Sequence, residues 1–220
     1  MTFDLFDALP ADPDATPAVE PLAPGAVVLR GFARDTGPDL LAAVQAVSAE
    51  APFRHLITPG GLRMSVAMTN CGERGWVSDR TGYRYDPVDP ESGCTWPAMP
   101  SVLRSLAERA AEAAGYTGFA PDACLINRYL PGTRLSLHQD RDELDLRAPI
   151  VSVSLGLPAI FLWGGLRRAD RPSRLRLAHG DVVVWGGPSR LVFHGIAPLA
   201  DGDHALTGNE RINLTFRKTR

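Results

Sequence analysis

The second half of the chain most constrains the fold, because short apolar runs alternate there with Gly- and Pro-containing turns. The runs are Leu125–Leu130, Ile150–Leu157, Ile160–Trp163, Leu175–Leu177, Val182–Trp185 and Ile212–Phe216. Many short strands without helices between them are typical of an antiparallel sandwich or barrel. We therefore predict a mainly β protein of the α+β class whose core is a jelly roll with flanking helices, since the open mouth of a jelly roll can gather ligands from separate strands.

The first half predicts one strand, two helices and a looped region. Ala26–Leu29 is the expected strand, and apolar residues from Leu40 to Val47 recur at helical spacing behind Asp35 and Thr36. A second helix is expected over Ser101–Ala114, where Gly115 ends it. Residues 53–100 carry many Gly and Pro residues, which predict hairpins and loops outside the core.

The chain has the length of one structural domain, and we divide it into three segments. Residues 1–24 are rich in Pro, Ala and Asp and are expected to be a mobile lead-in. Residues 25–120 form an extension with supporting helices, and residues 121–220 form the jelly-roll core.

Composition excludes several classes of protein. Hydrophobic residues make up 45% and charged residues 22%, which is ordinary for a soluble globular protein. No run reaches the roughly 20 apolar residues of a membrane span, and the N-terminus lacks the order of a signal peptide, so a cytoplasmic monomer is expected. Cys71, Cys94 and Cys124 have no metal-ligand spacing and are expected to be reduced thiols. The net charge of −2 argues against broad adhesion to nucleic acid, although a local basic strip could still bind a short strand.

The pattern His138-x-Asp140, followed by His194, indicates a metal site. Residues two apart on a strand point to one face, and two imidazoles with one carboxylate form the triad of non-haem iron oxygenases. A histidine and an aspartate at this spacing also occur by chance, and such histidines are more often surface or core residues. His55, His179 and His204 lie in no such pattern, and we assign them no ligand role.

The last expected strand carries Arg211, Asn213 and Arg217 at alternating positions, so that all three would face one interior. A guanidinium can bind a carboxylate through two hydrogen bonds, which would suit 2-oxoglutarate. The alternative for Arg217 is a salt bridge to an Asp or Glu of the chain.

Aromatic and basic residues indicate a surface that could bind nucleic acid. Trp76 and Tyr83 lie among Gly-rich, polar residues, where a stacking role competes with the usual role of core aromatics. Six arginines fall in or near expected loops around the mouth of the jelly roll, where they could contact phosphates or simply face solvent: Arg134, Arg141, Arg167, Arg168, Arg171 and Arg174.

The sequence resembles the AlkB family of Fe(II)- and 2-oxoglutarate-dependent DNA-repair dioxygenases over roughly residues 22–217. The resemblance is carried by Thr58–Gly61, Met64–Gly72, Pro121–Tyr129, Leu135–Asp140, Arg147–Gly156, His179–Gly187 and Asn213–Arg217. Runs of this length are more specific than the triad, which many oxygenases share. The family fold is a double-stranded β-helix with an N-terminal lid that recognises nucleotides, which the resemblance places within residues 25–120.

The resemblance implies roles for individual residues. It makes His138, Asp140 and His194 the iron ligands. It assigns binding of 2-oxoglutarate to Arg211, Arg217, Asn127, Tyr129 and Asn213. Trp76 and His138 would enclose the damaged base, Tyr83 would contact the substrate backbone, Asp142 and Arg168 would help to select the base, and Met68 and Thr58 would belong to loops over the site. Asp142 is also counted with the ligands as a catalytic residue.

The implied activity is oxidative demethylation of 1-methyladenine and 3-methylcytosine, with release of formaldehyde, succinate and CO2. The implied partner is alkylated single-stranded DNA, with double-stranded DNA and RNA as further candidates. Two alternatives stay open. A hydroxylase of a free small molecule would need the triad and Arg217 but not Trp76 and Tyr83. A binding jelly roll without catalysis would keep its ligand affinity after loss of the metal.

Overall fold

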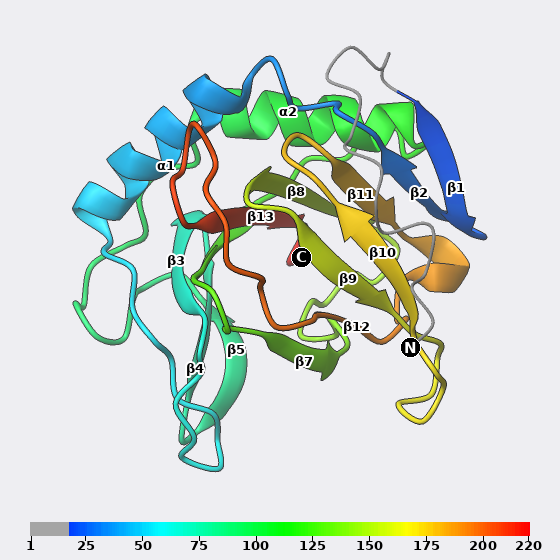
Figure 1. The fold of residues 1–220 in the computed structure, drawn as a ribbon. Helices are drawn as coiled ribbons and strands as arrows, with labels where there is room; N and C mark the ends of the chain where they lie inside the picture. Colours follow the sequence, from blue (N-terminus) through cyan, green and yellow to red (C-terminus); the bar gives the residue numbers. More distant parts are fainter. Residues whose placement is uncertain (1–17) are drawn as a thin grey trace.

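The structure is a computed structural model, and it describes residues 18–220 of the chain. Its strands are β1 (Val19–Ala23), β2 (Ala26–Leu29), β3 (Ala67–Gly72), β4 (Gly75–Asp79), β5 (Gly82–Asp86), β6 (Ala123–Tyr129), β7 (Leu135–His138), β8 (Ile150–Gly156), β9 (Ala159–Trp163), β10 (Ser173–Leu177), β11 (Val182–Trp185), β12 (His194–Ile196) and β13 (Arg211–Arg217). Its helices are α1 (Gly37–Glu50), α2 (Ser101–Ala113) and the short 3-10 helix η1 (Gly187–Ser189). The predicted mainly β fold with flanking helices is confirmed (Figure 1).

The core consists of two facing antiparallel sheets. The larger sheet has the order β1-β2-β11-β8-β13-β6-β3, and the smaller sheet has the order β10-β9-β12-β7. Strands β2 and β3, from the first half of the chain, pair with β11 and β6. The jelly-roll core expected over residues 121–220 therefore also contains β2 and β3, which come from residues 25–120.

The lead-in expected over residues 1–24 is only partly within the described residues, since residues 1–17 lie outside them. The expectation is wrong for its last part. Val19–Ala23 forms strand β1, which pairs antiparallel with β2 and places Val19 opposite Leu29. Hydrogen bonding at this sheet edge outweighs the low strand preference of Pro21.

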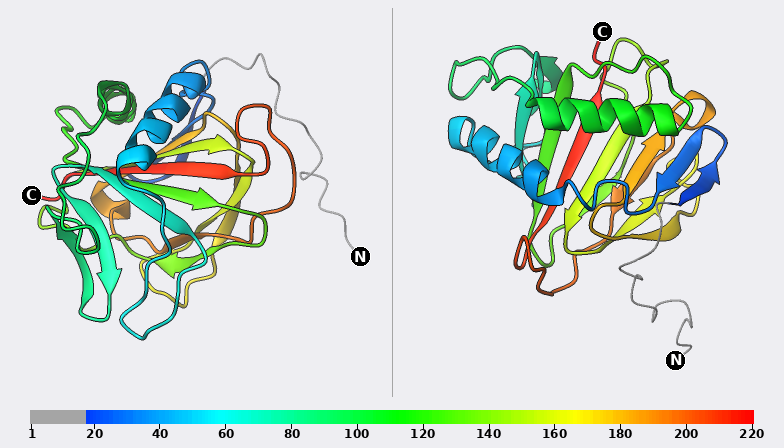
Figure 2. Two further views of the ribbon diagram at one scale, coloured as in Figure 1. Left: turned by 90° about the vertical axis from the view of Figure 1, so that its left-hand side faces the viewer. Right: turned by 90° about the horizontal axis from the view of Figure 1, so that it is seen from above.

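Both helices cover one face of the larger sheet, as Figure 2 shows in its right-hand view. Leu40, Val44 and Val47 of α1 and Leu103 and Leu106 of α2 belong to one buried cluster with the outer side chains of the sheet. Helix α2 ends at Ala113, one residue earlier than predicted, and Gly115 follows with φ +87. This left-handed conformation is favourable for glycine and is common just beyond a helix.

Strand β13 is buried along its whole length because helices cover one of its faces and the smaller sheet covers the other. Its apolar residues pack in the cluster beneath the helices: Ile212, Leu214 and Phe216. Its polar residues line a cavity between the sheets: Arg211, Asn213, Thr215 and Arg217. The predicted alternation on this strand is thus confirmed, and it aims two arginines into the interior.

Strands β4 and β5 form a separate two-stranded hairpin beside the jelly roll (Figures 1 and 2). The hairpin lies within residues 53–100, which were predicted to form hairpins and loops outside the core; that prediction is wrong for residues 67–72, which form the buried strand β3 of the larger sheet. The hairpin places Trp76 directly opposite Tyr85. Side chains on one face of the hairpin therefore include Trp76, Tyr83 and Tyr85.

Neither α-helix within residues 18–220 has the length and apolar character needed to cross a bilayer. All three cysteines are free; Cys71 and Cys124 are buried, and Cys94 is exposed.

Candidate active site

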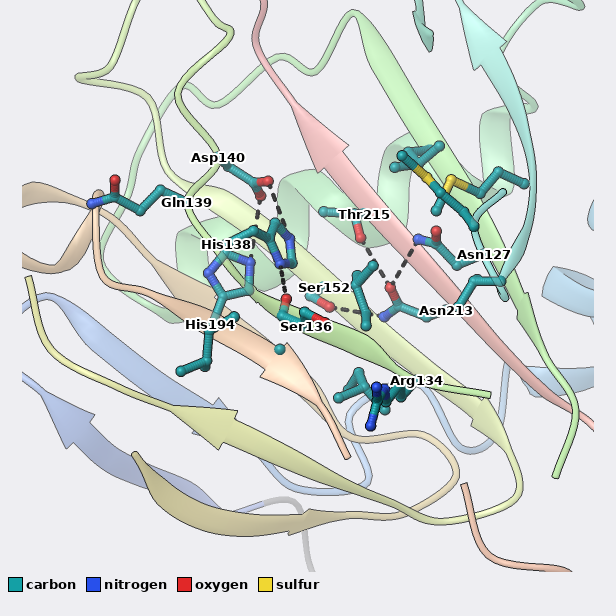
Figure 3. A pocket seen from close by; sticks show the side chains of 18 of the residues that line it. Asn127, Arg134, Ser136, His138, Gln139, Asp140, Ser152, His194, Asn213 and Thr215 are labelled. Carbon is teal, nitrogen blue, oxygen red and sulfur yellow. Dashed lines mark hydrogen bonds and ion pairs between the residues drawn. The ribbon is translucent and has the colours of Figure 1, made fainter. Parts of the chain in front are cut away.

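Three potential metal ligands meet at one end of the cavity. His138 ends strand β7 and His194 begins β12, and the antiparallel register of these strands sets the two residues side by side. Asp140 follows two residues beyond His138, outside the strand, so the expectation that both would lie on one strand holds only for His138. The ligand atoms of the three residues lie within 4.8 Å of one another. Figure 3 shows both imidazoles facing the carboxylate.

Hydrogen bonds fix the orientation of both imidazoles. His138 Nδ1 lies 2.9 Å from the carbonyl oxygen of Ser136, and His194 Nδ1 lies 3.1 Å from that of Val192. Because a carbonyl accepts, each Nδ1 carries a proton, and in a neutral imidazole this leaves the Nε2 lone pair free for a metal. Both Nε2 atoms lie 3.7 Å from an oxygen of Asp140. The lone pairs and the carboxylate thus converge on one point.

The electrostatics of the cluster favour a bound cation. Burial, followed by the neighbouring His138, lowers the pKa of His194 to about 4, so its imidazole is neutral at neutral pH. Burial alone raises the pKa of Asp140, but Arg217 and the two histidines outweigh it and hold this pKa below its usual range. Two imidazoles and one carboxylate are the donor set of non-haem Fe(II) sites with open positions. The residues present therefore fit Fe(II).

Arg211 lies deeper in the same cavity and has hydrogen-bonding capacity to spare. Its Nη2 donates to Ser154 Oγ at 3.0 Å, and its guanidinium lies 5.0 Å from the centre of the Tyr129 ring. Its Nε and Nη1 are buried and find no partner among the described residues. Burial lowers the pKa of Arg211, whereas Tyr129 acts in the opposite direction. A buried guanidinium with two unpartnered nitrogens is costly unless an anion satisfies them.

The two asparagines near Arg211 differ in whether their side-chain oxygen has a hydrogen-bond partner. Asn213 Nδ2 donates to Ser152 Oγ at 2.8 Å and to the Val153 carbonyl at 2.9 Å, and its Oδ1 accepts from Thr215 Oγ1 at 3.0 Å. Asn127 Oδ1 is buried without a partner among residues 18–220. Asn213 thus holds the inner side of the sheet together, whereas Asn127 keeps a free acceptor at the cavity wall.

Arg217 faces the metal cluster. Its Nη2 lies 2.8 Å from Asp140 Oδ2, and its Nε lies 3.3 Å from Glu143 Oε1. The salt bridge to the chain's own acids, the alternative that the sequence left open for Arg217, is therefore present. The two arginines of β13 therefore have different surroundings. Arg211 has buried N–H groups without a partner among residues 18–220, and Arg217 has none.

Two aromatic residues of the hairpin form a stacked pair beside this cavity. The ring centres of Trp76 and Tyr83 are 5.5 Å apart, and the ring planes are inclined by 12°. Trp76 Nε1 donates to Asp142 Oδ2 at 2.8 Å. The cavity has a volume of about 750 Å³, and Trp76, Tyr83, His138 and Asp142 all line it. This volume accommodates a nucleobase-sized group together with a small dicarboxylate.

The remaining predicted residues fall into two groups. Thr58 lies in a loop, and Arg168 is exposed with its guanidinium 5.1 Å from the centre of the Phe193 ring; both line the cavity. Met68 also lines the cavity, but the prediction that it belongs to a loop is wrong. Met68 is 3% exposed within strand β3, because β3 pairs with β6 and its side chain joins the core.

Sequence reasoning missed a buried polar network behind Asp140. Arg190 donates to the Asp140 carbonyl at 2.6 Å and to Glu143 Oε2 at 3.0 Å. Tyr85 donates its hydroxyl to Glu143 Oε1 at 2.6 Å. Burial raises the pKa of Tyr85 well above its usual value. The positive charge of Arg217 acts in the opposite direction, and the carboxylates of Glu143 and Asp140 add to the increase. The only sequence signal for Tyr85 was its position two residues after Tyr83, on the same face of a strand.

A jelly roll that holds two imidazoles, one carboxylate and a buried, partly unsatisfied arginine in one cavity has the site of a 2-oxoglutarate-dependent Fe(II) oxygenase. Residues 25–217 of the sequence match the 2OG-Fe(II) oxygenase superfamily. The chain is 62% identical to the alpha-ketoglutarate-dependent dioxygenase AlkB of Escherichia coli (strain K12), covering 93% of this chain and 95% of that protein. It is 47% identical to the AlkB homolog of Caulobacter vibrioides (strain NA1000 / CB15N), covering 82% of this chain and 81% of the relative.

The solved structure of OsALKBH1 is also similar, with a TM-score of 0.82 and 30% identity, covering 91% of this chain and all of that chain. The chain therefore belongs to the AlkB family of Fe(II)- and 2-oxoglutarate-dependent dioxygenases. Fe(II), 2-oxoglutarate and O2 are the requirements of this family.

Proposed function

We propose that this dioxygenase repairs alkylated nucleic acid by oxidative demethylation of 1-methyladenine and 3-methylcytosine, with a preference for single strands. The observation that carries the proposal is the shared cavity: the stacked Trp76 and Tyr83 and the carboxylate of Asp142 line the same space as His138. A free small molecule would not require this aromatic pair. The similarity to AlkB proteins over nearly the whole chain supports the same activity.

We assign the metal to His138, Asp140 and His194, and the distal carboxylate of 2-oxoglutarate to Arg211. The unpartnered Nε and Nη1 of Arg211 can donate charge-assisted hydrogen bonds to a carboxylate. Asn127 and Tyr129 complete the wall on this side, and Asn213 holds the wall in place. Bound Fe(II) supplies the oxidation in which O2 and 2-oxoglutarate give a hydroxylated methyl group, succinate and CO2.

The chain's own residues select and orient the base. Trp76 and His138 enclose its ring, and Tyr83 contacts the backbone of the substrate strand. Base stacking on an aromatic side chain contributes about 1–3 kcal/mol. Methylation of the Watson–Crick edge gives the base a positive charge, so the Asp142 carboxylate favours the damaged form. Loss of pairing also reduces the cost of extruding the base, and a single strand avoids most of that cost.

Three exposed arginines stand at the rim of the cavity: Arg134, Arg141 and Arg168. We propose that they contact the phosphates of the substrate strand. Arg167 instead pairs with Asp170 at 2.9 Å, and Arg171 and Arg174 do not line the cavity. Double-stranded DNA and RNA are further substrates to test, and a cytoplasmic monomer is part of the same proposal.

The test is release of formaldehyde from a short single-stranded DNA that carries 1-methyladenine or 3-methylcytosine, with Fe(II), ascorbate and 2-oxoglutarate. Release should require 2-oxoglutarate and disappear in His138→Ala. His204→Ala is the matched control, because His204 is a partly buried histidine outside the cavity. Slow succinate formation without formaldehyde would retain the dioxygenase but reject nucleic acid repair in favour of a free small-molecule substrate.

A further inference from the structure

The hairpin that carries Trp76 is held to the rest of the molecule by side chains. It forms its own two-stranded sheet and shares no strand pairing with the jelly roll among the described residues. Asn70 of β3 holds the backbone of Trp76 through two hydrogen bonds of 3.0 Å. Trp96 Nε1 donates to the carbonyl of Asp86 at 2.9 Å. These anchors fix the hairpin to its neighbours but do not reach the metal cluster.

Tyr85 supplies an anchor of a different kind. It lies directly opposite Trp76 in the hairpin, so the two side chains project from the same face. Its hydroxyl donates to Glu143 Oε1 at 2.6 Å. Glu143 is 6% exposed and Tyr85 is partly buried, so this hydrogen bond is shielded from most of the solvent and is made to a charged acceptor. Bonds of this type are stronger than those between neutral groups.

Glu143 in turn contacts both guanidinium groups that hold Asp140. Arg190 donates to Glu143 Oε2 at 3.0 Å and to the Asp140 carbonyl at 2.6 Å, so it links the two residues. Arg217 lies 3.3 Å from Glu143 Oε1 and 2.8 Å from Asp140 Oδ2. A continuous buried path of hydrogen bonds and ion pairs therefore runs from the hairpin to the metal-binding carboxylate.

We propose that Tyr85 is a positioning residue that sets the distance between the stacking hairpin and the metal cluster. The proposal rests on the proposed function, in which the base lies between Trp76 and His138. His138 stands two residues before Asp140, so the gap for the base depends on how firmly the hairpin is tied to that segment. The bond from Trp76 to Asp142 spans the same gap at the exposed rim, whereas the Tyr85 bond spans it in the interior.

The variant Tyr85→Phe removes this hydroxyl and keeps the ring. We expect the KM for a 3-methylcytosine oligonucleotide to rise about tenfold, the order of one lost hydrogen bond to a charged group. If the base is held less firmly, 2-oxoglutarate is converted to succinate more often without demethylation of the base, so the ratio of succinate to formaldehyde should also rise. The affinity for Co(II), read from its visible absorption, should stay close to that of the unmodified protein, because Arg217 and Arg190 still hold Asp140.

Tyr116→Phe is the matched control. Tyr116 donates its hydroxyl to the Gly25 carbonyl at 2.7 Å, outside the cavity, so the variant loses one tyrosine hydrogen bond without touching the site. It should leave the KM and the product ratio unchanged. Hydrogen exchange over residues 75–86, measured without substrate, adds a second readout: Tyr85→Phe should accelerate exchange there, and Tyr116→Phe should not.

Faster exchange in Tyr85→Phe with an unaltered KM and product ratio would make the bond merely structural and overturn the proposal. No change in any readout would overturn it as well.

Glu143→Gln extends the test toward the metal and should weaken Co(II) binding about tenfold, as expected for residues that support metal ligands. If the unmodified enzyme releases no formaldehyde, the proposed function fails. In that case hydrogen exchange and Co(II) binding still decide whether the path from Tyr85 to Asp140 exists.

Discussion

Arg217 donates two hydrogen bonds to a single oxygen of Asp140, from Nε at 3.1 Å and from Nη2 at 2.8 Å. The same oxygen lies 3.7 Å from His194 Nε2, and the other oxygen of Asp140 lies 3.7 Å from His138 Nε2. The guanidinium therefore fixes the plane of the carboxylate so that each oxygen faces one imidazole. Arg217 orients a metal ligand in the way that supporting residues commonly do in metal sites.

Arg217→Lys should consequently weaken metal binding by about tenfold or more. Lysine keeps the positive charge but cannot form two hydrogen bonds to one carboxylate with a rigid fork. Titration with Co(II) followed by visible absorption measures the change, and the exposed Arg174→Lys serves as control. A larger loss of affinity for 2-oxoglutarate than for the metal would instead make Arg217 chiefly an anchor of the co-substrate.

Arg211→Met should raise the dissociation constant of 2-oxoglutarate at least thirtyfold. Truncating one partner of a buried, hydrogen-bonded charge pair costs about 2–5 kcal/mol, and each 1.4 kcal/mol corresponds to about tenfold in affinity. Calorimetric titration of the Mn(II)-loaded protein measures this constant without turnover. Ser154→Ala removes only the hydroxyl that accepts from Arg211 Nη2 and should have a much smaller effect. Equal effects of the two variants would contradict the assignment of Arg211.

Trp76→Ala should lower kcat/KM for methylated oligonucleotides by about 5- to 150-fold, which corresponds to the removal of one stacking interaction of roughly 1–3 kcal/mol. Decarboxylation of 2-oxoglutarate without a nucleic acid substrate should change far less, because Trp76 is not among the metal ligands. Parallel assays of formaldehyde and succinate separate the two effects. If both fall by the same factor, Trp76 supports the fold rather than the substrate.

The sequence could predict the parts of the site that depend on strand periodicity. Arg211, Asn213 and Arg217 alternate with apolar residues that pack beneath the helices, so their inward direction follows from a period of two. Strand β8 was predicted within one residue for the same reason. The likeness to a known family then supplied roles that periodicity cannot assign.

Other parts of the site depend on contacts between distant segments, which local patterns do not contain. Strand β12 has only three residues, and its histidine meets His138 through the register between β12 and β7. Glu143 and Arg190 are charged residues that sequence patterns place at the surface, yet they are buried because each satisfies the other. Strand β3 contains the polar Thr69 and Asn70, which concealed its burial beside β6.

The rim arginines lead to a prediction about ionic strength. Arg134→Ala and Arg141→Ala should each weaken binding of a single-stranded oligonucleotide and reduce the slope of log K against log salt by about one unit for each phosphate that the variant no longer neutralises. Fluorescence anisotropy over a series of salt concentrations measures both quantities. Arg171→Ala is the control, because Arg171 is exposed but does not line the cavity. Unchanged slopes in both rim variants would reject the phosphate contacts.

His179 leads to a prediction about pH and stability, away from the metal cluster. Its Nδ1 accepts a hydrogen bond from the Gly156 N–H at 3.0 Å, and its ring lies 4.6 Å from that of His204. Burial, followed by His204 and Arg34, lowers its pKa below the ordinary 6.5, although a backbone hydrogen bond with Arg34 and the charge of Asp181 act in the opposite direction. His179 therefore binds a proton less tightly in the folded protein than in the unfolded chain.

Because the folded-state pKa of His179 is depressed, its neutral form contributes stability above about pH 6.5, and this contribution is lost as the pH falls below that value. His179→Gln keeps a side-chain acceptor and cannot be protonated, so its free energy of unfolding should fall less steeply between about pH 7 and pH 5. Urea unfolding of both proteins across this range gives the two slopes. The histidines and the aspartate of the metal cluster are the same in both, so their titration cancels in the difference. Parallel curves would show that protonation of His179 costs the folded state nothing and that its hydrogen bond to Gly156 is replaced without loss.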